Sequence, residues 1–111
     1  MRLVEIHNAN AVTVFIGSYQ IFQSYKTVYA MSYTIPLTDE QKKEPGIWRG
    51  YDRHIVRLPK ISVTTSKHFN KFFYTDGAIV HEVYAEKFDD LFRLILQGCP
   101  VEEVHGVLIN V

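Results

Sequence analysis

The side chains that could carry acid–base or metal chemistry are five histidines, one cysteine and scattered carboxylates. The histidines stand singly along the chain, with no HxH pair, no HExxH motif and no second cysteine: they are His7, His54, His68, His81 and His105. Zinc sites have recognisable ligand spacings, and none of them is present. We therefore expect no metal and no cofactor.

A hydrolase could be built from His68, His81 and Glu82, but nothing in the sequence brings these three together. In a strand over residues 79–84, His81 is more simply a half-buried, hydrogen-bonded side chain. Cys99 follows a helix end, where the thiol pKa should rise, which is the wrong direction for a nucleophile. The chain also lacks GxSxG, Walker and GxGxxG motifs. We expect that it is not an enzyme.

Charge is distributed unevenly along a chain that is neutral as a whole. Residues 42–71 hold eight basic and two acidic side chains, a net of +6, whereas residues 72–111 hold two basic and seven acidic side chains, a net of −5. A candidate basic patch for nucleic acid consists of Arg49, Arg53, Arg57, Lys60, Lys67, His68 and Lys71. The alternative is that the basic and acidic segments pair with each other, within the chain or across a dimer.

Tyrosines form a second candidate surface. If residues 19–33 were one continuous strand, alternation would place Tyr19, Tyr25, Tyr29 and Tyr33 on one face. A break near residues 24–26 would divide that stretch into two strands. Residues 35–46 contain two prolines, a glycine and five charges, and we interpret them as a long surface loop suited to binding.

The remaining elements follow from periodicity. Strands are predicted over 3–7, 11–16, 47–58, 60–63, 79–84 and 104–111, and helices over 66–73 and 86–97. We expect a single α+β domain over residues 1–111, in which one antiparallel sheet of about five or six strands is packed on one side by the two helices. The expected core comprises Leu3, Val12, Val14, Ile16, Phe69, Phe72, Phe88, Leu91, Phe92 and Ile95.

The cellular compartment is predicted from the chain length, the cysteine count and the distribution of apolar residues. At 111 residues and 47% hydrophobic composition, it has material for one core. A lone cysteine allows no internal disulfide, polar residues interrupt the N-terminal apolar stretch, and no apolar run approaches the roughly 20 residues of a membrane span. We expect a cytoplasmic protein with no membrane partner.

Two short stretches resemble a family of small uncharacterised proteins from phages and mobile elements. The stretches are Ser24-Tyr25-Lys26-Thr27-Val28-Tyr29-Ala30 and Ser62-Val63-Thr64-Thr65-Ser66-Lys67-His68-Phe69-Asn70, against a family pattern of roughly SYxTxVA followed by SxTTxKHxN and a short acidic helix. The resemblance spans residues 11–97, although Tyr29 replaces the usual valine and residues 35–47 are longer. It implies a viral accessory protein in the host cytoplasm.

These patterns favour a non-catalytic viral or phage binding protein, expected to be a homodimer, that contacts a host or viral protein partner. An exposed sheet edge, the tyrosine face or the 35–46 loop could provide the contact surface. The alternative is a nucleic-acid-binding module that uses the basic segment 42–71, for which salt-dependent binding is the signature.

Overall fold

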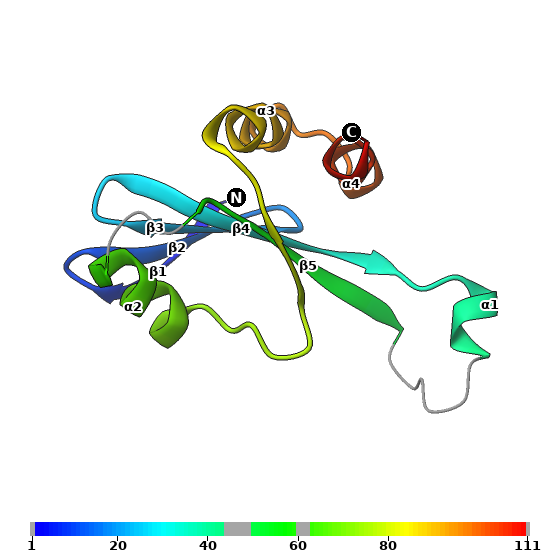
Figure 1. Ribbon diagram of the computed structural model, residues 1–111, viewed down its shortest axis with the longest axis horizontal. Helices are drawn as coiled ribbons and strands as arrows, with labels where there is room; N and C mark the ends of the chain where they lie inside the picture. Colours follow the sequence, from blue (N-terminus) through cyan, green and yellow to red (C-terminus); the bar gives the residue numbers. More distant parts are fainter. Residues whose placement is uncertain (1, 44–49, 60–62, 111) are drawn as a thin grey trace.

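The computed structural model describes residues 2–43, 50–59 and 63–110, which form an α+β fold of one six-stranded sheet and four helices (Figure 1). The strands are β1 (Arg2–Asn8), β2 (Ala11–Ile16), β3 (Tyr19–Ser24), β4 (Thr27–Pro36), β5 (Tyr51–Arg57) and β6 (Ile79–Glu82). The helices are α1 (Asp39–Lys42), α2 (Val63–Phe72), α3 (Ala85–Leu96) and α4 (Val101–Ile109). The break near residues 24–26 is confirmed, since a turn at Tyr25 separates β3 from β4.

The strands lie in the sheet in the order in which they occur in the chain. Neighbours from β1 to β5 are antiparallel, but β6 runs parallel to β5, with His54 aligned to Ile79 and Arg57 to Glu82. The expectation of a purely antiparallel sheet is therefore wrong at this last strand. A parallel neighbour requires a crossover connection, and the connection from β5 to β6 contains α2.

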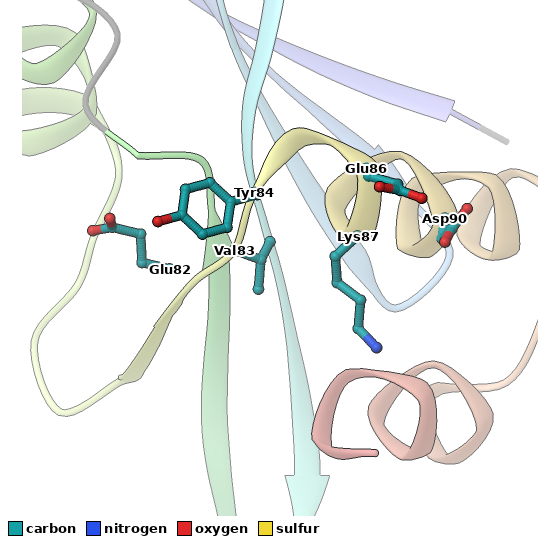
Figure 2. A pocket seen from close by; sticks show the side chains of 6 residues that line it. All are labelled: Glu82, Val83, Tyr84, Glu86, Lys87 and Asp90. Carbon is teal, nitrogen blue, oxygen red and sulfur yellow. The ribbon is translucent and has the colours of Figure 1, made fainter. Parts of the chain in front are cut away.

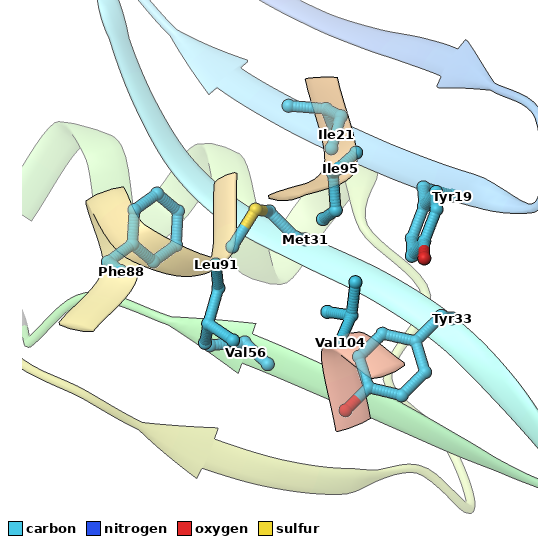
Figure 3. Packing of buried hydrophobic residues seen from close by; sticks show 9 residues of the cluster. All are labelled: Tyr19, Ile21, Met31, Tyr33, Val56, Phe88, Leu91, Ile95 and Val104. Atoms are coloured by element: carbon cyan, nitrogen blue, oxygen red, sulfur yellow. The ribbon is translucent and has the colours of Figure 1, made fainter. Parts of the chain in front are cut away.

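Helices cover both faces of the sheet, whereas the sequence analysis placed them on one (Figure 1). On one face, which we call the α3/α4 face, Phe88, Leu91 and Ile95 of α3 and Val104 of α4 pack on β3, β4 and β5 (Figure 3). On the other, the α2 face, Phe69 of α2 and the adjacent Phe73 pack on a second cluster. The core members of that cluster on the sheet are Ala11, Phe22, Tyr29, Ala30 and Ile55.

Residues 104–111 were expected to form a strand, but the chain is helical from Val101 to Ile109. The apolar residues Val101, Val104, Val107 and Leu108 lie on the helical spacing i, i+3, i+6 and i+7, and all four contribute to the core on the α3/α4 face. Pro100 at the N-cap and two glutamates in the first turn also favour a helix start. These signals outweigh the strand preference of valine.

The segment 35–46 is partly ordered rather than a bare loop. Strand β4 continues to Pro36, and Thr38 then starts α1 with a capping box. In it, the backbone N–H of Gln41 donates to Thr38 Oγ1 at 3.2 Å, and the backbone N–H of Thr38 donates to Gln41 Oε1 at 2.9 Å. Residues 44–46 lie outside the described residues, as do Lys60, Ile61 and Ser62 of the expected strand over 60–63, whose last residue, Val63, begins α2.

A β-bulge in β4 allows this strand to serve both cores. Phe22 pairs with Ala30 and Gln23 pairs with Val28, so Tyr29 is an extra residue without its own cross-strand partner. Val28 and Met31 therefore face α3 and α4, whereas the adjacent pair Tyr29 and Ala30 faces α2. The backbone carbonyl of Tyr29 accepts a hydrogen bond from the Leu58 N–H at 3.0 Å.

The expected core is confirmed at its centre and wrong at its edge. Phe69, Phe88, Leu91 and Ile95 are buried. The side chains of Val12, Val14, Ile16, Phe72 and Phe92 are only partly buried. Leu3 is exposed because the sheet ends at β1 and α2 contacts this strand at His7, through Phe72, rather than at Leu3.

The depth of burial predicts different costs for two phenylalanines of α3. Phe88→Ala should lower the free energy of unfolding by about 3–5 kcal/mol, because it leaves a cavity between α3 and the sheet. Phe92→Ala should cost clearly less, since that ring is partly exposed. Urea denaturation of both variants measures the difference, and equal losses would contradict the packing described here.

Candidate functional site

The outer edge of β1 is open. Its side chains Leu3, Val4 and Ile6 are 60%, 57% and 73% exposed. Glu5 pairs with Thr13, whose side chain is buried on the α2 face, and Val4 pairs with Val14, which packs toward α3 and α4. By alternation, Leu3 lies on the α2 face, and Val4 and Ile6 lie on the other. In the described part of the chain, no strand pairs with this edge.

Two arginines of the expected basic patch are used inside the fold. The Arg53 guanidinium lies over the Phe73 ring, 5.1 Å from its centroid, and donates to the backbone carbonyl of Tyr74 and to Ser32 Oγ at 3.3 Å. Arg57 donates to Tyr29 Oη at 3.2 Å, and its Nη2 lies 3.1 Å from Glu82 Oε2. These contacts hold both guanidiniums against the α2 face.

The remaining described members of the basic patch lie on α2. Lys67 and Lys71 are exposed on α2, with the Lys71 ammonium 5.3 Å from the Phe72 ring centroid. His68 shares a hydrogen bond of 2.9 Å between its Nδ1 and Ser24 Oγ. Arg49 and Lys60 lie outside the described residues.

The four tyrosines do not share a face, so the expected tyrosine surface is wrong. Tyr19 and Tyr33 are buried against α3 and α4, Tyr29 is buried on the α2 face, and Tyr25 is exposed at a turn with φ of 57°. The bulge at Tyr29 interrupts the alternation on which that expectation depended. Burial raises the pKa of Tyr19 to about 12 and raises that of Tyr33 as well.

Three histidines that are distant in sequence meet beneath α4, and we call them, with Tyr33, the histidine cluster. His54 Nδ1 lies 3.0 Å from His81 Nε2 in a hydrogen bond between β5 and β6. The ring centroids of His54 and His105 are 4.5 Å apart, and His105 Nδ1 is hydrogen-bonded to Tyr33 Oη at 2.8 Å. Tyr33 also stacks on His54, with centroids 5.7 Å apart.

The sequence analysis missed this cluster because its members come from a strand pairing and a helix that were not predicted. Parallel pairing aligns Val56 with His81, so His54 and His81 are diagonal neighbours on one face. His105 joins them only because residues 101–109 are helical. To place His54 next to His81 from the sequence, parallel pairing of β5 with β6 would have had to be predicted.

The hydrolase set of His68, His81 and Glu82 does not assemble. His68 is on α2, which covers one face, whereas His81 points to the opposite face, toward His54 and His105. Glu82 is paired with Arg57 instead. Among the described residues, no group of three or more His, Cys, Asp or Glu side chains is arranged to hold a metal ion.

A shallow hollow of about 480 Å³ lies where β6 leads into α3 (Figure 2). Carboxylates Glu82, Glu86 and Asp90 line it together with exposed Tyr84, and the Lys87 side chain extends from it toward α4 (Figure 2). Lys87 Nζ donates to the carbonyls of Val107 and Asn110 at 2.6 and 3.2 Å. Its ammonium therefore stabilises the C-terminal end of α4.

Cys99 does not have the environment of a reactive thiol. Its pKa is raised, chiefly by burial and further by Glu103, which agrees with the expected direction. The sequence analysis attributed the rise in the Cys99 pKa to the helix end alone. Cys99 instead contributes to the core through its packing, and its carbonyl accepts a 2.7 Å hydrogen bond from Tyr19 Oη.

Comparison with protein-family models, with curated proteins and with solved structures finds no match to this chain. The described helices include none long and apolar enough to cross a membrane.

Arg53 should prove to be a structural residue. Arg53→Ala removes charge-assisted hydrogen bonds and the contact with Phe73, so we expect the free energy of unfolding to fall by about 1–3 kcal/mol. Lys67→Ala, on the exposed face of α2, should change it by no more than about 0.5 kcal/mol. Thermal and urea denaturation measure both, and an Arg53→Ala variant as stable as Lys67→Ala would refute the assignment.

Proposed function

We propose that this chain is a non-catalytic binding protein whose docking element is the outer edge of β1. The observation that carries the proposal is the exposure of Leu3, Val4 and Ile6 along a seven-residue edge strand. An unpaired strand edge presents backbone donors and acceptors to any second extended chain, and alternate side chains then provide apolar contacts.

This edge has only part of the protection that natural sheets commonly give their outer strands: a register shift between Ile6 and Asn8, and the stacking of His7 on Phe72 of α2. Protected edges are short, or carry lysines or prolines, or lie beneath a helix or loop. Strand β1 contains no lysine and no proline, and its ionisable side chains are Arg2, Glu5 and His7. An apolar strand left open in this way supports a role in binding.

The occupant that we propose is β1 of a second copy of the chain. Antiparallel pairing of two identical edges about a two-fold axis is closed and self-complementary, so that each strand offers the same patch that it receives. It would join two sheets into one and bring Leu3 on one face, and Val4 and Ile6 on the other, beside side chains of the second copy. Near-neutral charge along residues 3–8 places little repulsion across such a contact.

The resemblance of residues 11–97 to small phage and mobile-element proteins adds a viral or phage origin to the proposal. With that origin, we propose a location in the host-cell cytoplasm and a host or viral protein as a further partner. The separation of His68 from His81 on opposite faces of the sheet disfavours the hydrolase considered above. The open edge supports contact with an extended protein segment.

Charge placed on the edge should abolish self-association. Val4→Lys should convert a dimer into a monomer in sedimentation velocity, because two ammonium groups would face each other across the paired strands. Leu96→Lys is the matched control, since Leu96 is equally exposed but lies on α3, and it should remain dimeric. Wild-type protein that stays monomeric at every concentration would refute the homodimer, and a dimer unaffected by Val4→Lys would place its interface elsewhere.

A nucleic-acid-binding role remains the second candidate, favoured by the exposed Lys67 and Lys71 on α2. If it is correct, fluorescence anisotropy with labelled DNA or RNA should show binding that weakens steeply with added salt. The double variant Lys67→Ala/Lys71→Ala should then bind more weakly and with a shallower salt dependence. Absent or salt-insensitive binding would exclude this role and leave the protein-binding proposal unaffected.

A further inference from the structure

The histidine cluster is not used by the proposed docking edge. It joins three elements, because His54 belongs to β5, His81 to β6 and His105 to α4. The contacts are close: 3.0 Å between His54 Nδ1 and His81 Nε2, and 4.5 Å between the ring centroids of His54 and His105. Three imidazoles at such separations form a titratable group whose members interact.

We propose that the histidine cluster is a proton-operated latch, which holds α4 and β6 against the sheet while its imidazoles are neutral and releases α4 when they take up protons.

The hydrogen bond between His54 and His81 explains why protons would open the latch. One imidazole nitrogen must donate and the other must accept, which neutral rings can do. When both rings are protonated, all their nitrogens are donors, so the bond is lost and two positive charges are left 3.0 Å apart at their nearest nitrogens. His105 stands beside the same rings and would add to this repulsion.

The groups around the cluster leave most of that repulsion uncompensated. Asp52, on the same strand as His54, is the one carboxylate acting on that ring, and it partly favours the charged form. From β4 the facing group is Tyr33 and from β3 it is Tyr19, and burial raises the pKa of both. The carboxylates of α4, Glu102 and Glu103, act on Tyr19.

The direction of the pKa shifts agrees with this geometry. Burial lowers the pKa of His54, and His105 and His81 lower it further. Burial also lowers the pKa of His81, followed by the effect of His105. A histidine with a lowered pKa stabilises the closed state fully above its ordinary value of 6.5 and loses that contribution as the pH falls toward the lowered value. Opening is therefore favoured below about pH 6.5.

Helix α4 is the element that the latch can release because, among the described residues, Val104 is its one fully buried side chain. Val101, Val107 and Leu108 pack on the core while staying partly exposed, and Lys87 holds the C-terminal carbonyls of the helix. Strand β6 has four residues, and in the described part of the chain it pairs only with β5. Peripheral elements with few buried side chains open at lower free energy than the centre of a sheet.

Hydrogen exchange of the whole chain at pH 7.5 and pH 5.5, corrected for the intrinsic exchange rate, tests the latch. Amides of α4 should lose protection by threefold to tenfold per pH unit, since each proton taken up on opening changes the equilibrium by up to tenfold per unit. Amides of β3 should show no such loss. Uniform loss of protection over the whole chain, or no loss in α4, would overturn the proposal.

Two variants separate the latch from a general acid effect. His81→Gln preserves a hydrogen-bonding side chain on β6 but removes one titrating ring, so the loss of α4 protection at pH 5.5 should shrink at least threefold. His68→Gln, on the α2 face, should respond as the wild type does. Equal responses of the two variants would overturn the proposal.

If His81→Gln does not fold, an NMR titration of the wild-type imidazoles gives the answer. Protonation of His54 and His81 must then coincide with changes in the α4 amide signals. Protonation of both rings without any change in α4 would overturn the latch. None of these outcomes depends on whether β1 binds a second copy.

Discussion

Burial of both faces of the sheet, but only at its centre, is the constraint from which the rest of this structure follows. Strands β3, β4 and β5 contribute to the cores on both faces. The extra residue Tyr29 makes this arrangement work within β4, because it redirects one large ring toward α2 while Met31 and Tyr33 face α3 and α4. A regular strand at this point would place Tyr29 beneath α3 and leave Phe69 with Phe22 alone of its two edge-to-face partners.

The same constraint determines which strands of the sheet remain open to contact with other molecules. Three helices cover the central strands, and residues 3–8 of β1 and the whole of β6 contribute no buried side chain. At β1 the exposed side chains are apolar, which is the composition of an interface. At β6, Ile79 and Val80 are each 45% exposed and Glu82 lines the hollow, so this edge combines apolar and acidic side chains.

Hydrophobic periodicity along the sequence correctly predicted those elements that depend on neighbouring residues alone. Strands over 3–7 and 11–16 and the helix over 86–97 were correct because alternation or helical periodicity was uninterrupted there. The errors arose where a non-local factor dominated. Residues 104–109 are helical because their apolar face completes the core with α3, and the tyrosine face failed at a bulge that alternation cannot reveal. The histidine cluster depends on both a parallel pairing and that helix, so no spacing in the sequence marks it.

The two side-chain links that hold β6 to the sheet are not equivalent, and the difference determines which can act as a control element. Arg57 and Glu82 form an ion pair between the basic and acidic segments, but Glu82 is half exposed, so solvent screening limits its contribution to about 1 kcal/mol or less. The His54–His81 bond is more shielded, since His54 is only 8% exposed. Losing a shielded hydrogen bond costs about 1–3 kcal/mol, and a charge on the buried His54 ring is poorly hydrated, whereas His81 is partly exposed. The imidazole link therefore dominates the attachment of β6 by side chains, and it is the one that a change in proton concentration can reach.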